Sequence, residues 1–196
     1  MNDEKKTRIE LTDWDRECMA WHEAGHAVCA HVLPEGSPVL RVSIVPGDDA
    51  FGSMQRALRP HHNETERSFR SSIGVFLAGG LSERLFLRRR TTSLADDLRV
   101  ASQIARDMVL RFGMGRRTGW LCLPDGMLKS DAFLGNAEAD MRDILNKSAK
   151  EATEALRTHA ALVKSLALRL LSEGTVSLPF SRKRERESHG LSATDR

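Results

Sequence analysis

Two histidines and one glutamate lie within five consecutive residues, His22-Glu23-Ala24-Gly25-His26. If this segment is helical, residues four apart stand one above the other on one face, so His22 and His26 can bind the same metal ion. Zinc is the expected ion, because imidazole nitrogens bind it and catalytic sites keep one position for water. Glu23 projects beside the pair, where its carboxylate can take a proton from that water without binding the metal. The chemistry expected of these three side chains is hydrolysis of a peptide bond.

The segment that carries this motif has the features of a single helix. It contains no proline between Trp14 and Leu33, and Thr12 or Asp13 is a suitable cap just before it. Small and apolar residues recur along one side, which predicts a buried face, and Pro34 follows as a stop signal. The motif therefore lies in the middle of the predicted helix. The alternative interpretation is an ordinary amphipathic helix whose two histidines are satisfied by hydrogen bonds.

Other hydrophobic patterns predict a mainly α fold with a small β-sheet. Residues 39–45 and 51–58 are rich in strand-forming side chains. Helical periodicity covers three later segments, 66–87, 94–112 and 137–173, the last with a candidate break at 158–159. The run Ala78-Gly79-Gly80 in the first of these predicts the close approach of another backbone, because glycine lowers helix stability and needs a packing reason.

A zinc site with two histidines and a water needs one more protein ligand. A third histidine six residues after His26 would fall on Val32, and His31 is one residue out of register. A glutamate from a later helix, Glu83, is the second candidate. The third candidate is Asp97.

The helix predicted at 94–112 places Asp97 next to its apolar, core-facing side. Its apolar stripe consists of Leu94, Leu98, Ala101, Ile104, Ala105, Met108 and Phe112. Asp97 lies at the edge of this stripe, whereas Asp96 falls on the opposite, polar side. A carboxylate on the core-facing side needs a partner, because burial of an unpaired charge is costly, and a metal ion is one such partner. A salt bridge or the helix N-terminus would also satisfy Asp97.

Composition and charge describe one folded domain. The chain has 196 residues, of which 40% are hydrophobic, enough for a real core. The net charge is only +3, the basic residues interleave with acidic ones, and Tyr is absent, so nucleic-acid binding is not expected. The three cysteines form no metal-type or disulfide pattern, and no apolar run is long enough to cross a membrane. These features favour a soluble, cytoplasmic protein with no membrane segment of its own.

The chain is expected to divide into three parts. Residues 1–12 form an N-terminal extension, and residues 13–180 form the metallopeptidase domain. Residues 181–196 are charged and rich in serine, and they are expected to be a disordered tail.

Five ordered groups of residues resemble the peptidase domain of the FtsH-type AAA zinc metalloproteases, which are membrane-bound and ATP-dependent. These groups are residues 21–28, 42–47 with 51–52, 77–83, 91–98 and 105–114. The resemblance implies that His22 and His26 bind zinc and that Glu23 is the general base. It also implies that Asp97, at the last position of the family's Thr-Thr-Gly-Ala-Ser-Asn-Asp run, is the third ligand. A further implication is assembly into hexameric rings.

The chain departs from the family pattern at several positions. Ser93-Leu94 stands where the family has Gly-Ala, and Gly80 stands where an arginine is usual. The basic run 88–90 occupies the loop before the ligand segment. These differences affect the expected loop geometry and leave the ligand set unchanged. The sequence also has no Gly-x-x-x-x-Gly-Lys-Ser/Thr phosphate loop, so the chain is expected to act without an ATPase of its own.

The predicted function is that of a zinc-dependent metalloendopeptidase. Zinc lowers the pKa of a bound water toward neutrality, Glu23 accepts its proton, and the hydroxide attacks a polarised carbonyl. The expected substrates are unfolded or flexible protein chains, held extended along an edge strand of the region 39–58. A separate ATPase is a candidate partner. The alternative is a non-catalytic or regulatory domain that assembles with full-length FtsH-type subunits, although the intact Glu23 argues against it.

Overall fold

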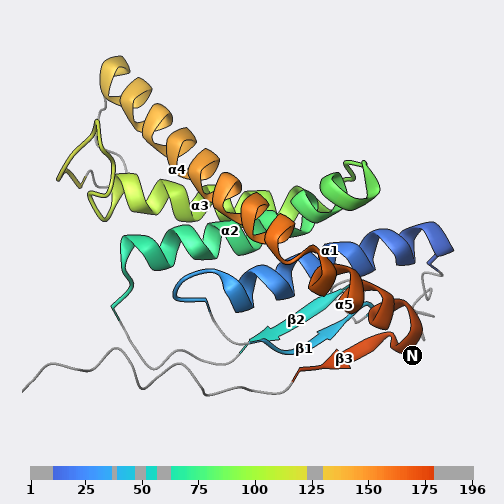
Figure 1. Ribbon diagram of the computed structural model, residues 1–196. Coiled ribbons are helices and arrows are strands. Elements are labelled where there is room, and N and C mark those ends of the chain that lie inside the picture. The colour runs from blue at the N-terminus through green and yellow to red at the C-terminus, as the bar shows by residue number, and fades with distance from the viewer. Residues whose placement is uncertain (1–10, 37–38, 47–51, 57–62, 123–129, 179–196) are drawn as a thin grey trace, which may run out of the picture.

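The computed structural model of the chain describes residues 11–36, 39–46, 52–56, 63–122 and 130–178. This part of the chain is mainly helical with one small sheet, which confirms the predicted fold class (Figure 1). The elements in order are α1 (Asp13–Val32), β1 (Val39–Ser43), β2 (Ser53–Arg56), α2 (Glu66–Ser82), η1 (Glu83–Leu87), α3 (Leu94–Leu110), α4 (Asp131–Thr158), α5 (Ala160–Glu173) and β3 (Thr175–Ser177).

The sheet lies on one side of α1, and α2 and α3 follow on the other side (Figure 1). Its strand order is β2-β1-β3, and both pairings are antiparallel. The central strand places Arg41 opposite Gln55 of β2 and opposite Ser177 of β3. The main buried cluster joins α1 to the sheet and to α5, and it includes Ala24, Val28, Val42, Val163, Leu170 and Val176. The helix that carries the histidines is therefore packed on two sides.

Close contact between α1 and α2 depends on a glycine inside the motif. A Cβ at Gly25 would lie 2.6 Å from the carbonyl oxygen of Ala78 and 2.6 Å from the Cβ of Ser82, both in α2. Such distances exclude any side chain at position 25. The two helices can therefore pass close together between His22 and His26.

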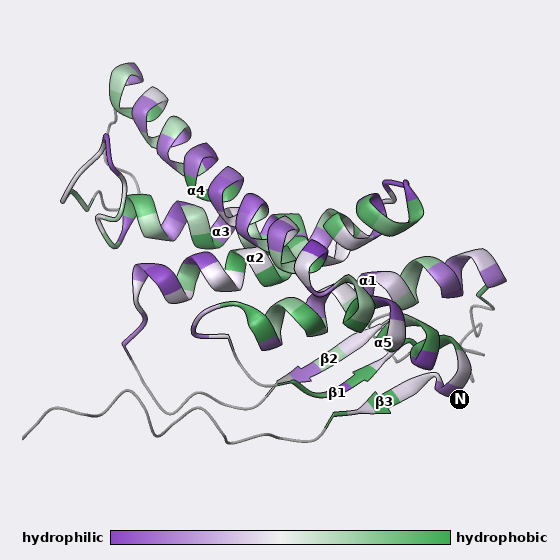
Figure 2. Ribbon diagram, viewed as in Figure 1, coloured by the Kyte–Doolittle hydropathy of each residue, from purple (hydrophilic) through white to green (hydrophobic). Residues whose placement is uncertain are grey.

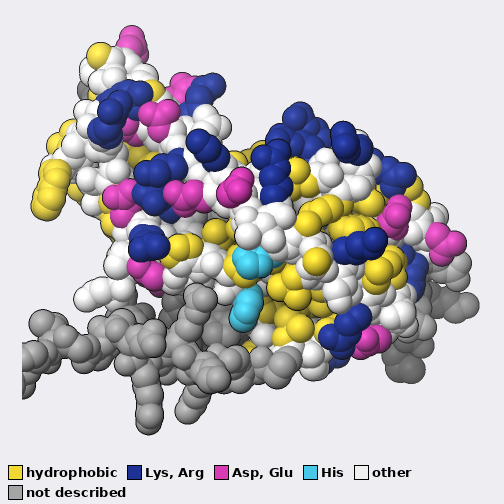
Figure 3. All heavy atoms as spheres, viewed as in Figure 1, with side chains coloured by type: hydrophobic (Ala, Val, Ile, Leu, Met, Phe, Trp, Pro, Cys, Tyr) yellow, Lys and Arg dark blue, Asp and Glu magenta, His cyan; other side chains and the backbone are white. Residues whose placement is uncertain are grey.

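A second cluster of buried side chains joins α2, α3 and α4, and its fully packed members are Ile73, Leu77, Ala101, Ala105 and Met108. The long helix α4 crosses α2 and α3 and keeps its hydrophilic residues on the outside (Figure 2). Positive and negative side chains alternate over this part of the surface (Figure 3). Within the described ranges no helix combines the length and the apolar character needed to cross a membrane.

The structure also corrects several predicted boundaries. The helix predicted at 66–87 is α-helical only to Ser82, and its last residues form the π-helical segment η1. The last helix begins at Asp131, earlier than the predicted residue 137, and the candidate break is confirmed at His159 between α4 and α5. Strand β3 was not predicted at all. Its three residues become a strand because β1 offers a second free edge beside the end of α5.

Some predictions fall partly or wholly outside the described residues. The strand predicted at 51–58 appears as Ser53–Arg56, and its outer positions are not described. The proposed tail at 181–196 and most of the extension at 1–12 also lie outside the described ranges.

Candidate metal centre and catalytic base

Helix α1 holds the two histidines in its middle, as the sequence predicted. Its N-cap is Thr12, whose Oγ1 accepts a hydrogen bond from Asp15 N at 3.1 Å, while Asp15 Oδ2 accepts one from Thr12 N at 3.0 Å. This reciprocal capping box fixes where the helix begins. His22 and His26 are each only 6% exposed. Their rings meet edge to face with centroids 4.6 Å apart.

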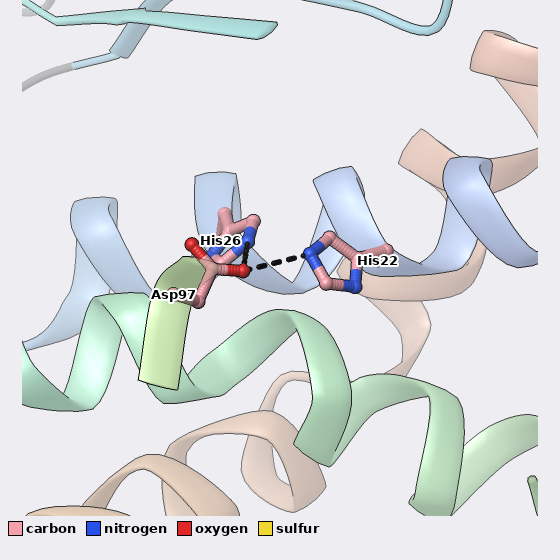
Figure 4. Close-up of side chains that lie close together, drawn as sticks. All are labelled: His22, His26 and Asp97. Carbon is pink, nitrogen blue, oxygen red and sulfur yellow. Dashed lines mark hydrogen bonds and ion pairs between the residues drawn. The ribbon is translucent and has the colours of Figure 1, made fainter. Parts of the chain in front are cut away.

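Asp97 in the first turn of α3 points at both rings (Figure 4). Its Oδ2 lies 3.0 Å from His22 Nε2 and 3.2 Å from His26 Nε2. One ligand atom from each of the three residues lies within 4.8 Å of the others, close enough to hold one metal ion. Residues from two helices, 71 and 75 positions apart in sequence, thus meet at one point.

The other ring nitrogen of each histidine already has a partner. His26 Nδ1 lies 2.7 Å from the carbonyl oxygen of Val75, and His22 Nδ1 lies 2.6 Å from Glu83 Oε1. A carbonyl and an ionised carboxylate only accept hydrogen bonds, so both Nδ1 atoms carry the proton. In the neutral tautomers both Nε2 lone pairs then face the Asp97 carboxylate, and three electron-rich atoms converge. Two imidazole nitrogens and one carboxylate oxygen are a donor set that fits zinc. The hydrogen bonds at the two Nδ1 atoms fix the orientation of the rings.

His22 and Asp97 each shift the pKa of the other. Burial opposes ionisation of Asp97, but hydrogen bonds with His22 and His26 outweigh it and hold the pKa of the carboxyl well below its usual value. Burial likewise opposes a charged His22, but its hydrogen bonds with Asp97 and Glu83 raise its pKa to about 9. Without a metal ion, these shifts favour a charged His22 beside an ionised Asp97. A metal ion at this point would compete with the proton of the charged imidazole.

Glu83 lies behind His22, on the side of the ring away from Asp97. It is fully buried, and its Oε1 faces Nδ1 while Asp97 faces Nε2. Burial raises the pKa of Glu83, but hydrogen bonds from His22, Ser93 and Thr91 outweigh it and lower the pKa. Of the alternatives for a third ligand, the geometry therefore favours Asp97 and gives Glu83 the place of a partner to His22. His31 is exposed.

Glu23 follows His22 on α1 and is partly buried. Burial raises the pKa of its carboxyl, and the neighbouring His26 and His22 partly offset that rise. The chain just before β2 passes directly beside this side chain, because a Cβ at Gly52 would lie 2.4 Å from Glu23 Oε1. The start of an outer strand is thus adjacent to the carboxylate expected to act as the base.

The sequence of this domain matches a known peptidase family over most of its length. Residues 9–179 fit the pattern of peptidase family M41. The chain belongs to that family. It is 38% identical over 130 residues to the ATP-dependent zinc metalloprotease FtsH of Thermobaculum terrenum, covering 65% of this chain and 20% of the relative. The resemblance to FtsH-type peptidase domains is confirmed.

Two further relatives cover more of this M41 chain. The FtsH of Rubrobacter xylanophilus is 28% identical over 194 residues, which is 92% of this chain and 30% of the relative. The mitochondrial inner membrane m-AAA protease component YTA10 of Saccharomyces cerevisiae is 32% identical over 182 residues, 89% of this chain and 24% of the relative. The chain thus spans less than a third of the length of the curated relatives it matches.

Gly80 and Leu94, two of the positions expected to depart from the family pattern, pack against one another. A Cβ at Gly80 would lie 2.8 Å from Leu94 Cδ2, so Leu94 fills the space that a side chain at position 80 would need. A Cβ at Gly79 would lie 2.4 Å from His22 Nε2. The two glycines therefore make room for Leu94 and the imidazole of His22. The close approach of another backbone, predicted for 78–80, occurs at Ala78, whose carbonyl faces Gly25 of α1.

Sequence analysis missed three features of the site. The carbonyl of Val75, the approach of Gly52 to Glu23, and the position of Glu83 behind His22 all depend on packing between separate elements. The prediction that Leu98 and Phe112 belong to the buried stripe of α3 is wrong, since each side chain is 45% exposed and α3 ends at Leu110, before Phe112. The stripe narrows at the first turn of α3, where Asp97 faces the α1 histidines and Leu98 turns to solvent.

Proposed function

We propose that this M41 domain is a zinc metalloendopeptidase in which His22, His26 and Asp97 bind the ion. The observation that carries the proposal is the convergence of two Nε2 atoms and Asp97 Oδ2, with both Nδ1 atoms already hydrogen bonded. A bound zinc ion supplies Lewis acidity, which lowers the pKa of a coordinated water and polarises a peptide carbonyl. The names of the relatives, zinc metalloproteases, support the same ion.

Glu23 has the properties of a general base for this reaction. It stands beside the two imidazoles, does not belong to the converging ligand set, and its pKa is raised by burial. A raised pKa makes the carboxylate a better proton acceptor near neutral pH. In this proposal Glu23 takes the proton of the attacking water and then passes it to the leaving amine.

The substrate is proposed to be an unfolded or flexible protein segment that lies extended along β2. This strand forms one edge of the sheet, and the chain at its beginning contacts Glu23. Addition of a strand to such an edge would carry a peptide past the reacting groups by main-chain hydrogen bonds.

Proline substitutions at matched positions test this placement. Gln55 in β2 and Ser177 in β3 both lie opposite Arg41, on the two outer strands. Gln55→Pro should reduce kcat/KM for a peptide, whereas Ser177→Pro should leave it near the wild-type value under conditions where both variants are folded. Equal kcat/KM in the two variants would remove β2 as the docking edge.

The delivery of substrate to this domain and the assembly of the domain are proposed by analogy. Those relatives are named ATP-dependent, so we propose that an ATPase also delivers substrate to this domain. Assembly into a hexameric ring is proposed from the resemblance to FtsH-type proteases alone. Its thiols, of which Cys18 and Cys29 are buried and Cys122 exposed, are free in the structure and are compatible with the reducing cytoplasm.

The decisive experiment measures zinc content and cleavage of casein or a peptide in wild type and Glu23→Gln. We expect both proteins to bind zinc and only wild type to cleave, with a loss of about 10²-fold or more in the variant. Glu17→Gln on the same helix is the control, because Glu17 pairs with Arg89 at the surface. Bound zinc without cleavage in any protein, together with entry into hexamers of a full-length FtsH, would favour the non-catalytic alternative.

A further inference from the structure

The loop between η1 and α3 reaches the buried carboxylate behind His22. Ser93 Oγ donates a hydrogen bond to Glu83 Oε1 at 2.6 Å, and Thr91 Oγ1 donates one to Glu83 Oε2 at 2.7 Å. The hydroxyl of Thr92, which lies between them in sequence, takes no part in this network. Two hydroxyls from one short segment thus hold both oxygens of a single carboxylate.

Ser93 acts on the carboxylate oxygen that matters for the metal site. Glu83 Oε1 is the atom that accepts from His22 Nδ1, and Ser93 Oγ lies 3.2 Å from that same nitrogen. Without Ser93, Oε1 would keep the imidazole of His22 as its donor and Oε2 would keep the hydroxyl of Thr91, so the carboxylate would lose one of its two hydroxyl donors. The orientation of the His22 ring depends on its Nδ1 partner, so looser placement of Glu83 becomes looser placement of Nε2.

The same hydroxyl also ties down the start of α3. Ser93 is the N-cap residue of that helix, and Asp97 lies in its first turn. A hydrogen bond from Ser93 to the buried Glu83 therefore restrains, through one contact, two of the three side chains that converge.

We propose that Ser93 is a positioning residue of the metal site, whose hydroxyl holds Glu83 against His22 and thereby strengthens metal binding. This inference rests on the proposed zinc site. Removal of a residue that orients a metal ligand typically weakens metal affinity by about 10- to 100-fold. Ser93 acts one hydrogen bond further away, so we expect Ser93→Ala to weaken zinc binding by roughly threefold to tenfold.

The test compares zinc dissociation constants of the full chain, measured by competition with a chelator. Ser93→Ala should bind zinc more weakly than wild type, Ser93→Thr should restore binding because it keeps the hydroxyl, and Thr92→Ala should match wild type. The visible absorption spectrum of the Co²⁺-substituted proteins supplies a second measurement, since it responds to ligand geometry. A changed spectrum is expected for Ser93→Ala and an unchanged one for Thr92→Ala.

Each outcome separates this inference from the proposed function. If wild type binds zinc and Ser93→Ala binds it equally tightly with the same Co²⁺ spectrum, Ser93 has no positioning role. If affinity falls in Ser93→Ala but Ser93→Thr does not restore it, the effect is not due to the hydroxyl and the inference is also overturned. If wild type binds no zinc, both the inference and the proposed metal centre fail.

Discussion

Two buried carboxylates in this domain have similar surroundings and different consequences. Glu83 is fully buried and Asp140 is 2% exposed, and hydrogen bonds lower the pKa of both in spite of burial. Asp140 accepts from the backbone N–H groups of Arg117 and Thr118, from the Thr118 hydroxyl, and from the Arg117 guanidinium. Its charge is neutralised locally, and beyond Arg117 the network continues to Asp143 at the surface.

The hydrogen bonds that begin at Glu83 continue through His22 to the converging site. The main donor to Glu83 is His22, whose second nitrogen faces Asp97 and His26 at the converging site. A histidine transmits the effect of a carboxylate to whatever its other nitrogen binds, whereas an arginine paired with an aspartate only neutralises it. The residue that pairs with each carboxylate therefore explains the difference. Glu83 pairs with a histidine and acts on the metal site, whereas Asp140 pairs with an arginine and stabilises the fold.

The largest expected effect comes from a test that distinguishes the proposed metal ligand, Asp97, from the hydrogen-bond partner of His22, Glu83. Asp97→Ala should abolish stoichiometric zinc binding, because it removes a donor atom. Glu83→Ala should leave zinc bound with affinity lowered by about 10- to 100-fold. Zinc content after dialysis and chelator competition measure both effects.

The control for this test is Asp96→Ala, next to the proposed ligand but with a side chain 94% exposed, which should not change zinc binding. The assignment would be reversed if Glu83→Ala lost zinc and Asp97→Ala retained it.

The second test concerns stability. Asp140→Ala would leave two backbone N–H groups and one hydroxyl without their acceptor and would remove one of the two carboxylates that bind Arg117, so the free energy of unfolding should fall by about 3 kcal/mol. Asp143→Ala removes a carboxylate that binds the same Arg117 from a side chain 60% exposed, and should cost less than about 1 kcal/mol. Urea unfolding gives both values. Zinc affinity of the folded Asp140→Ala protein should equal that of wild type, and a large loss would contradict the structural role.

A third, smaller effect is expected from pH. The pKa of Asp140 is lower in the folded state than its unfolded value of about 3.9, so its stabilisation is present above that value. It is lost as pH falls through the folded pKa, because the unfolded state then binds the proton first. The difference in unfolding free energy between wild type and Asp140→Asn should therefore shrink between pH 5 and pH 2. A difference that stays constant over this range, measured by urea unfolding, would show that ionisation of Asp140 contributes nothing.

The smallest effect tests the packing beside the metal centre. Gly80→Ala should gain up to about 1 kcal/mol of helix stability, but its Cβ would meet Leu94, which should offset the gain. In a Leu94→Ala background the clash is removed and the gain should appear. A double-mutant cycle by thermal unfolding should give a coupling of about 0.5–1 kcal/mol. If the effects of Gly80→Ala and Leu94→Ala on the free energy of unfolding simply add, the packing of Leu94 does not depend on the glycine at position 80.

Much of the fold and of the candidate site could be predicted because the signals are local. The spacing of His22 and His26, the cap at Thr12 and the break before α5 each depend on a few neighbouring residues. The three residues of β3 carry too weak a pattern, and they form a strand only because β1 has a free edge. Leu98 is exposed although it lies on the apolar stripe of the helical wheel, because the wheel gives the face of a helix and not which part of that face is covered.

By itself, the sequence determined that an imidazole pair and a glutamate lie on one helix and that Asp97 and Glu83 were candidates to complete the site. The tertiary structure showed where each candidate lies. The two carboxylates lie 75 and 61 positions from His22, and helix packing brings them to opposite nitrogens of the same ring. The periodicity of a helix fixes which side chains share a face. The distance and direction between two helices come from packing, which here depends on Gly25 and Gly79.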